Sequence, residues 1–145
     1  MAEQAKERKR TFKLEIITPE RLVVSEEVEA VVIPAAQGSL GILRNHTPFL
    51  GGLEIGIIKY RQEGKNHWVA CNTGVFEIRE NTLRILADTA ERGEDINVLR
   101  AQQARDRARQ RLREKEIDMD YLRAELALRR ALARLKAAAY EVKDP

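Results

Sequence analysis

Apolar and polar residues alternate along the first two thirds of the chain. Phe12-Lys13-Leu14-Glu15-Ile16 alternates at every position, which predicts a half-buried strand. Further apolar runs are separated by turn formers, such as Gln37-Gly38-Ser39 and Glu63-Gly64-Lys65-Asn66. These runs predict strands at 22–24, 28–33 (closed by Pro34), 40–43, 55–60, 67–71, 75–78 and 83–87. Short strands with turns about every 8 to 12 residues are typical of an antiparallel sandwich or small barrel.

The pattern changes once, at Gly93, the last of eight glycines. Between Glu94 and Asp144 there is neither Gly nor Pro, and the stretch is rich in Arg, Ala and Leu, which favours helix. A break near 116–118 separates two groups of apolar residues at helical spacing. They are Ile96, Leu99, Ala104, Ala108 and Leu112, then Leu122, Leu126, Leu128, Leu132, Leu135 and Ala139. Asp118 or Asp120 is placed to cap the second helix.

Together these patterns predict an α+β fold, with an N-terminal antiparallel β-sandwich followed by a C-terminal antiparallel two-helix hairpin. The predicted segments are a frayed tail at 1–10, the sandwich at 11–92 and the hairpin at 93–145. The apolar seam of the hairpin is thin and rich in alanine. We therefore expect the hairpin to lean on the sandwich and to be able to leave it.

Composition limits the classes of function that the chain can have. The 145 residues carry a net charge of +3 and only 5% aromatic residues, so platforms for stacking bases are scarce. The single cysteine, Cys71, lies in an apolar run, which predicts an inert packed thiol and a reducing compartment. No apolar stretch approaches the roughly 20 residues that span a bilayer, so we expect a soluble protein made in the cytosol.

The sequence offers no catalytic or metal-binding constellation. His46 and His67 lie in different predicted elements, and no Cys/His cluster has metal-ligand spacing. Gly51-Gly52 lacks the Lys-Ser/Thr and the strand-to-helix context of a phosphate loop. We therefore expect no catalytic residues and a protein that is not an enzyme.

Arginines of the hairpin are the strongest chemical signal. Arg100 and Arg107 share a face of the first predicted helix, and Arg130 and Arg134 share a face of the second. Antiparallel pairing would bring Arg100 opposite Arg134. Converging guanidinium groups suit a polyphosphate or a run of carboxylates on a partner. The alternative is a solvated basic face, balanced in part by pairs such as Glu125 with Arg129.

Residues 37–48, which read QGSLGILRNHTP, form the densest turn-rich patch of the β half. They are either a plain corner of the sandwich or an exposed docking edge. His46 by itself is more typical of a hydrogen-bonded turn residue than of a ligand.

Several motifs occur in one order along the chain. They are Gly38-x-Leu40-Gly41-Ile42-Leu43 with His46-x-Pro48, LADTAER at 86–92, Leu99-Arg100-Ala101, and Tyr121-x-x-Ala124-Glu125-Leu126-Ala127. The set covers Phe12 to Ala139, and it resembles the epsilon subunits of bacterial rotary ATP synthases. The resemblance implies a ten-stranded sandwich that binds the gamma subunit and rests on the membrane c-ring. The protein would then lie on the cytoplasmic side of the cell membrane as a peripheral, non-catalytic central-stalk subunit.

The same resemblance implies that the hairpin regulates ATP hydrolysis. It would pack on the sandwich in a compact state, or extend along gamma between the alpha and beta subunits and block hydrolysis. The implied contacts with beta subunits are Arg123, Arg129, Arg130 and Arg134, and those with the c-ring are Gln37, Gly38, Ser39 and His46. The chain departs from the family pattern at Ser39, where an acidic residue is common, and at Arg44, where Pro is common.

Some members of the family also bind ATP in the compact state, and ATP is the one regulatory ligand that the resemblance suggests; no cofactor is required. The corresponding positions here are Glu91, Ile96, Asn97, Arg100, Ala101, Arg107, Arg130 and Arg134. Asn97 stands where Asp is usual. Its amide can hydrogen-bond but brings no negative charge to position arginines.

Two interpretations from other classes stay open on the sequence. A small β-barrel with a basic hairpin is also compatible with a nucleic-acid-binding module, although the modest charge and few aromatic residues argue against it. An adaptor that uses the hairpin leucines as a zipper would self-associate.

Overall fold

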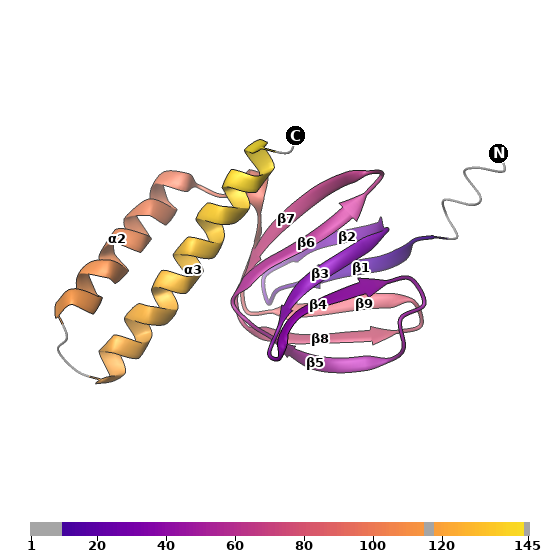
Figure 1. The fold of residues 1–145 in the computed structure, drawn as a ribbon, viewed down its shortest axis with the longest axis horizontal. Helices are drawn as coiled ribbons and strands as arrows, with labels where there is room; N and C mark the ends of the chain where they lie inside the picture. Colours follow the sequence, from indigo (N-terminus) through magenta and orange to yellow (C-terminus); the bar gives the residue numbers. More distant parts are fainter. Residues whose placement is uncertain (1–9, 115–117, 144–145) are drawn as a thin grey trace.

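The computed structural model describes residues 10–114 and 118–143, which form ten strands followed by a helical hairpin (Figure 1). The strands are β1 (Phe12–Ile17), β2 (Leu22–Val28), β3 (Ala30–Ala35), β4 (Gly38–Leu43), β5 (Phe49–Leu53), β6 (Gly56–Gln62), β7 (Lys65–Cys71), β8 (Gly74–Arg79), β9 (Thr82–Ala87) and β10 (Ala90–Arg92). A short 3-10 turn, η1 (Gly93–Asp95), leads into α2 (Val98–Glu114) and α3 (Asp118–Lys143). The predicted tail at 1–10 lies outside the described residues except for Arg10.

The strands form two layers that meet at β3. One layer has the order β10-β7-β6-β3-β4 and the other β5-β8-β9-β1-β2, and the pair Ala35–Leu53 joins β3 to β5 at the corner. β1 runs parallel to β9, with Leu14 beside Leu83, while the other strand pairs of the described residues are antiparallel. The prediction of a sandwich followed by a hairpin is confirmed.

Alternation along the strands builds the core between these layers. In β1, Phe12, Leu14 and Ile16 are buried while Lys13 and Glu15 are half-exposed. The core is mostly aliphatic, as the low aromatic content indicates, with Phe12, Tyr60 and Phe76 as its aromatic members. Burial of these apolar side chains is the main force that holds the layers together.

The sequence pattern did not predict two of the strands, and one predicted strand has the wrong bounds. The run 28–33 is divided, because β2 ends at Val28 and β3 begins at Ala30 and continues through Pro34. Pro34 is tolerated because β3 leaves β6 after Val32 and reaches β5 only at Ala35. The missed strands are β5, which contains Gly51-Gly52, and the three-residue β10.

Gly51 explains why β5 does not look like a strand in sequence. A Cβ atom there would lie 2.6 Å from Cζ of Phe76 on the neighbouring strand β8. The glycine therefore makes room for a buried aromatic ring, and a residue that reads as a turn former has a packing role in a strand.

The buried residues of the two helices are alanines, which confirms the predicted alanine-rich seam, but the predicted leucines are not among them. Ala101 and Ala108 are buried in α2, whereas Leu99, predicted to face the seam, is 65% exposed. In α3 the buried residues are Ala124, Ala131, Ala133, Ala137 and Ala138, and the predicted Leu122 is 56% exposed. Small side chains let two helices approach closely, so the seam follows alanine spacing. The predicted break near 116–118 lies between α2 and α3; residues 115–117 and the side chain of Asp118 lie outside the description.

Candidate functional site

The site with the most specific geometry is the contact between the hairpin and the sandwich. Figure 1 shows α3 between α2 and the strands, close to β7 and β6. A small apolar cluster separate from the main core fills this contact. It consists of Trp68, Ala70, Ile96, Ala101, Ala137 and Ala138, with Ile57 and Leu135 packed against it. Because four of the six buried members are alanines, the cluster brings little apolar area per residue to the contact.

Gly93 sets how closely α3 approaches the end of the sandwich. A Cβ atom at Gly93 would lie 2.7 Å from the backbone oxygen of Ala137 and 2.5 Å from Cγ of Glu141. Real Cβ atoms do not make contacts this short with backbone atoms, so any larger residue would push α3 away. The last glycine of the chain is therefore a contact point between the two parts of the fold.

Two polar contacts add to this apolar cluster. Nε of Arg134 in α3 donates to Oε1 of Glu91 in β10 at 2.8 Å, with side chains 32% and 35% exposed. The backbone N–H of Trp68 donates to Oε1 of Glu141 at 3.1 Å, and the ring of Trp68 lies 5.7 Å from that of Tyr140. The Glu91–Arg134 pair is partly solvated, so its contribution is about 1 kcal/mol or less.

The ATP-site residues predicted from sequence are brought together only in part. Glu91 contacts Arg134, and Ile96 and Ala101 share the apolar cluster. Ala101 packs with Ala137 and Ala138, so the start of α2 lies level with residues about one turn beyond Arg134. Within the described ranges the guanidinium groups of Arg100, Arg107 and Arg130 form no ion pair.

Asn97 has a structural role that the sequence did not predict. Its Oδ1 accepts the backbone N–H of Arg100 at 3.0 Å, and its carbonyl oxygen accepts the N–H of Ala101 at 3.0 Å. This is the geometry of a helix N-cap, and asparagine is as good a cap as aspartate. The replacement of Asp by Asn therefore leaves the start of α2 intact.

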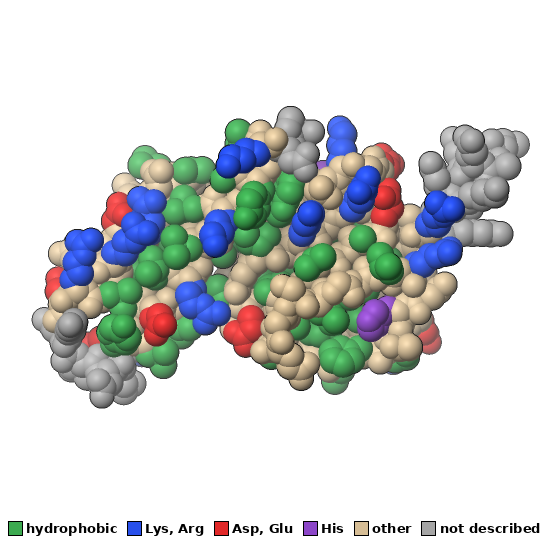
Figure 2. Space-filling model, in the orientation of Figure 1, with side chains coloured by type: hydrophobic (Ala, Val, Ile, Leu, Met, Phe, Trp, Pro, Cys, Tyr) green, Lys and Arg blue, Asp and Glu red, His purple; other side chains and the backbone are tan. Residues whose placement is uncertain are grey.

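The other arginines of the hairpin face solvent. Arg123 and Arg129 are exposed and Arg130 is half-exposed. The expected pair of Glu125 with Arg129 is not formed among the ion pairs of the described residues. Figure 2 shows Lys and Arg side chains spread along the visible face of the hairpin. The basic surface is thus available to a partner.

The residues predicted to contact a ring lie along one edge strand, β4. Gln37, Gly38 and Ser39 are exposed in and beside the turn that enters β4, and His46 follows its other end. The two groups are separated by residues 40–43 of the strand and by the two turn residues that follow it, a span of at most about 25 Å. Among the described strands, β4 pairs only with β3, so its outer edge is open. We name the stretch 37–46 the β4 edge.

A second exposed feature crosses the outer face of the β5-β8-β9-β1-β2 layer. Successive partners in the strand register place Val75, Leu86, Ile17 and Leu22 in one row, starting beside Gly52. Val75, Leu86 and Leu22 are 48%, 46% and 56% exposed. We name these four side chains the apolar row. Exposed apolar groups arranged in a continuous line are typical of an interaction surface.

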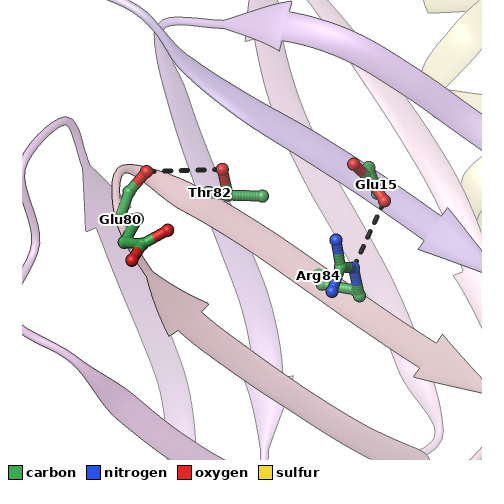
Figure 3. Close-up of polar contacts among 4 residues, drawn as sticks. All are labelled: Glu15, Glu80, Thr82 and Arg84. Carbon is green, nitrogen blue, oxygen red and sulfur yellow. Dashed lines mark hydrogen bonds and ion pairs between the residues drawn. The ribbon is translucent and has the colours of Figure 1, made fainter.

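The neighbouring row on the same face is polar. Nε of Arg84 lies 3.3 Å from Oε2 of Glu15 on the parallel strand β1 (Figure 3). At the β8–β9 turn, Oγ1 of Thr82 donates to the carbonyl oxygen of Glu80 at 3.5 Å (Figure 3). The apolar row is thus bordered by charged side chains, as interface patches commonly are.

Catalytic chemistry finds no support in the described part of the chain. No group of three or more His, Cys, Asp or Glu side chains there is arranged to hold a metal ion. Burial raises the pKa of the Cys71 thiol to about 12, so the prediction of an inert packed thiol is confirmed. No helix within the described ranges is long and apolar enough to cross a membrane.

Family models match almost the whole chain in two adjacent pieces. Residues 11–93 match the ATP synthase delta/epsilon chain beta-sandwich domain, and residues 94–139 match the long alpha-helix domain of the same chain. The ATP synthase epsilon chain of Symbiobacterium thermophilum is 48% identical over 126 residues, which cover 86% of this chain and 91% of that protein. The epsilon chain of Moorella thermoacetica is 49% identical over 129 residues, which cover 88% and 96%.

Solved structures support the fold. A chain in the mitochondrial ATP synthase of Euglena gracilis, solved as OSCP, F1 and c-ring, matches with a TM-score of 0.77 at 22% identity, over 90% of this chain and 82% of that one. A chain of the Tetrahymena thermophila central stalk and c-ring matches with a TM-score of 0.57 at 14% identity, over 86% and 94%. The family favours a stalk subunit over the nucleic-acid-binding and zipper interpretations. The chain belongs to the ATP synthase epsilon chains, the non-catalytic subunits of the central stalk.

Proposed function

We propose that this epsilon chain couples gamma to the c-ring and inhibits ATP hydrolysis through a two-state hairpin. In the compact state α3 packs on β7, and in the extended state the hairpin leaves the sandwich and enters the alpha/beta ring. The observation that carries the proposal is the contact itself, which combines an alanine-rich cluster with a close approach at Gly93 and a half-exposed ion pair. The contact is small enough for the hairpin to leave the sandwich, and specific enough for the hairpin to return in a single orientation.

The size of the contact fits a reversible switch. Each buried methyl-sized group contributes about 0.8 kcal/mol, and a partly exposed ion pair contributes at most about 1 kcal/mol. A contact built from four alanines, one isoleucine, one tryptophan and two polar bonds is therefore worth a few kcal/mol. A gap of that size is what a ligand or a partner surface can overcome.

In the extended state the exposed basic side chains become the contact surface. Arg123 and Arg129 already face solvent, and Arg130 is half-exposed. Release of the hairpin breaks the Glu91–Arg134 pair and adds a further guanidinium group to the same helix. Such a set suits acidic segments of the beta subunits, whose carboxylates guanidinium groups bind in a bidentate way.

ATP is the proposed ligand of the compact state. Arg134 uses only Nε for Glu91, so its terminal nitrogens remain to bind phosphate, together with Arg100, Arg107 and Arg130. A ligand that binds only the compact state stabilises it by about 2.7 kcal/mol at about a hundredfold excess over its Kd. This is comparable with the contact itself, so ATP would hold the enzyme in its active form.

Isothermal titration of the isolated chain with ATP tests this ligand. We expect saturable heat, and we expect Arg100→Ala or Arg134→Ala to weaken binding by about 10- to 100-fold, the usual loss for a charge-assisted hydrogen bond to phosphate. Arg109→Ala, in α2 and off the predicted site, is the matched control and should bind like the parent. Absence of heat with the parent chain would remove ATP as a ligand and leave the inhibitory switch standing.

The apolar row is the proposed gamma-binding surface. It lies on a rigid sheet, it is apolar over four neighbouring strands, and charged groups border it. The β4 edge is the proposed contact with the c-ring, which places the chain at the cytoplasmic face of the membrane as a peripheral subunit. Ser39 brings no charge to that contact, so backbone groups and shape would carry it.

Leu86→Glu tests the gamma assignment. Loss of a buried apolar contact of this size, with a charge in its place, should weaken binding to epsilon-depleted F1 by at least about tenfold. Val32→Glu is the matched control, because Val32 is similarly exposed, at 41%, on the other layer. Equal affinity of the Leu86 variant and the parent in a fluorescence titration would rule out the apolar row as the gamma contact.

A further inference from the structure

Asn81 links three segments that are far apart in sequence. It occupies the tight turn between β8 and β9, with φ of 57° beside Glu80 with φ of 51°. Both residues are in the left-handed region, which asparagine tolerates better than most side chains. Conformation alone, however, does not require asparagine, since glycine adopts the same φ more easily.

The side chain of Asn81 makes two bonds that glycine could not make. Its Oδ1 accepts the backbone N–H of Asn45 at 2.7 Å, across 36 residues of sequence. Its Nδ2 donates to the carbonyl oxygen of Thr11 at 3.2 Å, just before β1. The backbone oxygen of Asn81 also accepts the N–H of Lys13 at 3.2 Å. One amide thus joins the β8–β9 turn to the start of the sandwich and to the loop after β4.

Asn45 lies in the turn that follows β4, two residues after the strand ends at Leu43. It has φ of 58°, and the next residue is His46, whose Nδ1 lies 2.7 Å from the carbonyl oxygen of Thr47. Apolar side chains flank this loop, with Leu43 at 64%, Phe49 at 42% and Leu50 at 72% exposure. A loop that carries exposed apolar and imidazole groups needs a fixed backbone if it is to meet a partner in one orientation.

We infer that Asn81 is a positioning residue that fixes the His46 end of the β4 edge for docking on the c-ring. The inference rests on the proposed ring contact of that edge. Asn81 does not itself need to touch the ring. It holds the N–H of Asn45 and so sets the direction in which the loop projects.

Two substitutions separate this role from simple turn formation. Asn81→Gly keeps the left-handed turn and removes both side-chain bonds. Asn81→Asp also keeps the turn and keeps an oxygen acceptor for Asn45, and it replaces the donor to Thr11 by a second oxygen acceptor. A defect shared by both variants would reflect the bond to Thr11 or the turn. A defect of the glycine variant that aspartate rescues belongs to the Asn45 bond.

The experiment measures loop order and docking in parallel. Hydrogen exchange of the Asn45 amide, in the full-length chain, should be faster by about fivefold in Asn81→Gly and close to the parent in Asn81→Asp. Affinity is then measured twice, for the epsilon-depleted whole synthase and for epsilon-depleted F1, which lacks the ring. The ratio of the two affinities isolates the ring contribution, and we expect Asn81→Gly to lower it by about fivefold and Asn81→Asp to retain it.

Each result decides the inference. Unchanged Asn45 exchange in Asn81→Gly would overturn it, as would faster exchange with an unchanged affinity ratio, or equal losses in both variants. His46→Ala together with Gln37→Ala tests the ring contact separately. If the double variant His46→Ala with Gln37→Ala lowers the affinity ratio while Asn81→Gly does not, the proposed function holds and the role of Asn81 fails. If that pair leaves the ratio unchanged, the ring contact of the β4 edge itself is wrong.

Discussion

Gly93→Ala is expected to lower ATP hydrolysis by F1 that contains this chain. The added Cβ would collide with the backbone of Ala137 and with Glu141, so the compact state is destabilised. The φ of Gly93 lies outside the left-handed range, so alanine costs nothing in the extended state. The substitution therefore raises the free energy of the compact state and leaves that of the extended state unchanged. Because the extended state inhibits, a single methyl group makes the enzyme less active.

The expected size follows from the cost of overpacking, about 1–3 kcal/mol. The ratio of compact to extended chains should fall by about 5- to 150-fold. Gly41→Ala is the matched control, since a Cβ at Gly41 meets nothing within 4 Å and F1 lacks the ring that the β4 edge is proposed to contact. The measurement is the steady-state rate of ATP hydrolysis by epsilon-depleted F1 to which a saturating concentration of the parent or variant chain has been added. A Gly93→Ala complex as active as the parent would show that the hairpin contact does not control the rate.

Truncation after Arg92 is expected to have the opposite sign and to raise hydrolysis. The sandwich should stay folded, because β10 ends at Arg92 and the guanidinium of Arg92 donates to the carbonyl oxygen of Val23 at 3.1 and 3.0 Å. The basic helices that would enter the alpha/beta ring are gone. If half of the complexes are inhibited at any moment, the rate should rise about twofold, and more if the extended state dominates.

Binding of the truncated chain to epsilon-depleted F1 is the control for this second experiment. The apolar row is intact, so affinity in the absence of the hairpin should be set by the sandwich. Removal of α3 uncovers Trp68 and Ala70, which lowers solubility without touching that row. A truncated chain that binds fully and leaves the rate unchanged would place the inhibition elsewhere in the complex.

The sandwich could be predicted from sequence because its strands alternate on a two-residue period. Leu83, Ile85 and Ala87 are buried in β9 as their spacing indicates. The prediction failed where tertiary contacts override local signals. Gly51 reads as a turn residue and is a strand residue that accommodates Phe76, and Pro34 reads as a strand end and lies within β3.

The hairpin contact could be predicted only in outline. Helical spacing predicts two helices with an alanine-rich seam, but it also assigns Leu99 and Leu122 to that seam, and both are exposed. Alanine is equally common on exposed helix surfaces, so only the approach of the two helices reveals which ones are buried. The resemblance placed Glu91 and Arg134 in one site, whereas the bond of Asn97 to Arg100 and the role of Asn81 depend on contacts that no spacing rule contains.

The central claim is that α3 can leave the sandwich, and a distance between the two parts tests it most directly. Spin labels at Lys65→Cys in β7 and Glu125→Cys in α3 occupy exposed positions, and the buried Cys71, with its raised pKa, should not react. Pulsed electron spin resonance of the assembled F1 should give a short and a long distance. ATP should favour the short one and Gly93→Ala the long one. A single short distance in the parent and in Gly93→Ala, with and without ATP, would contradict the switch.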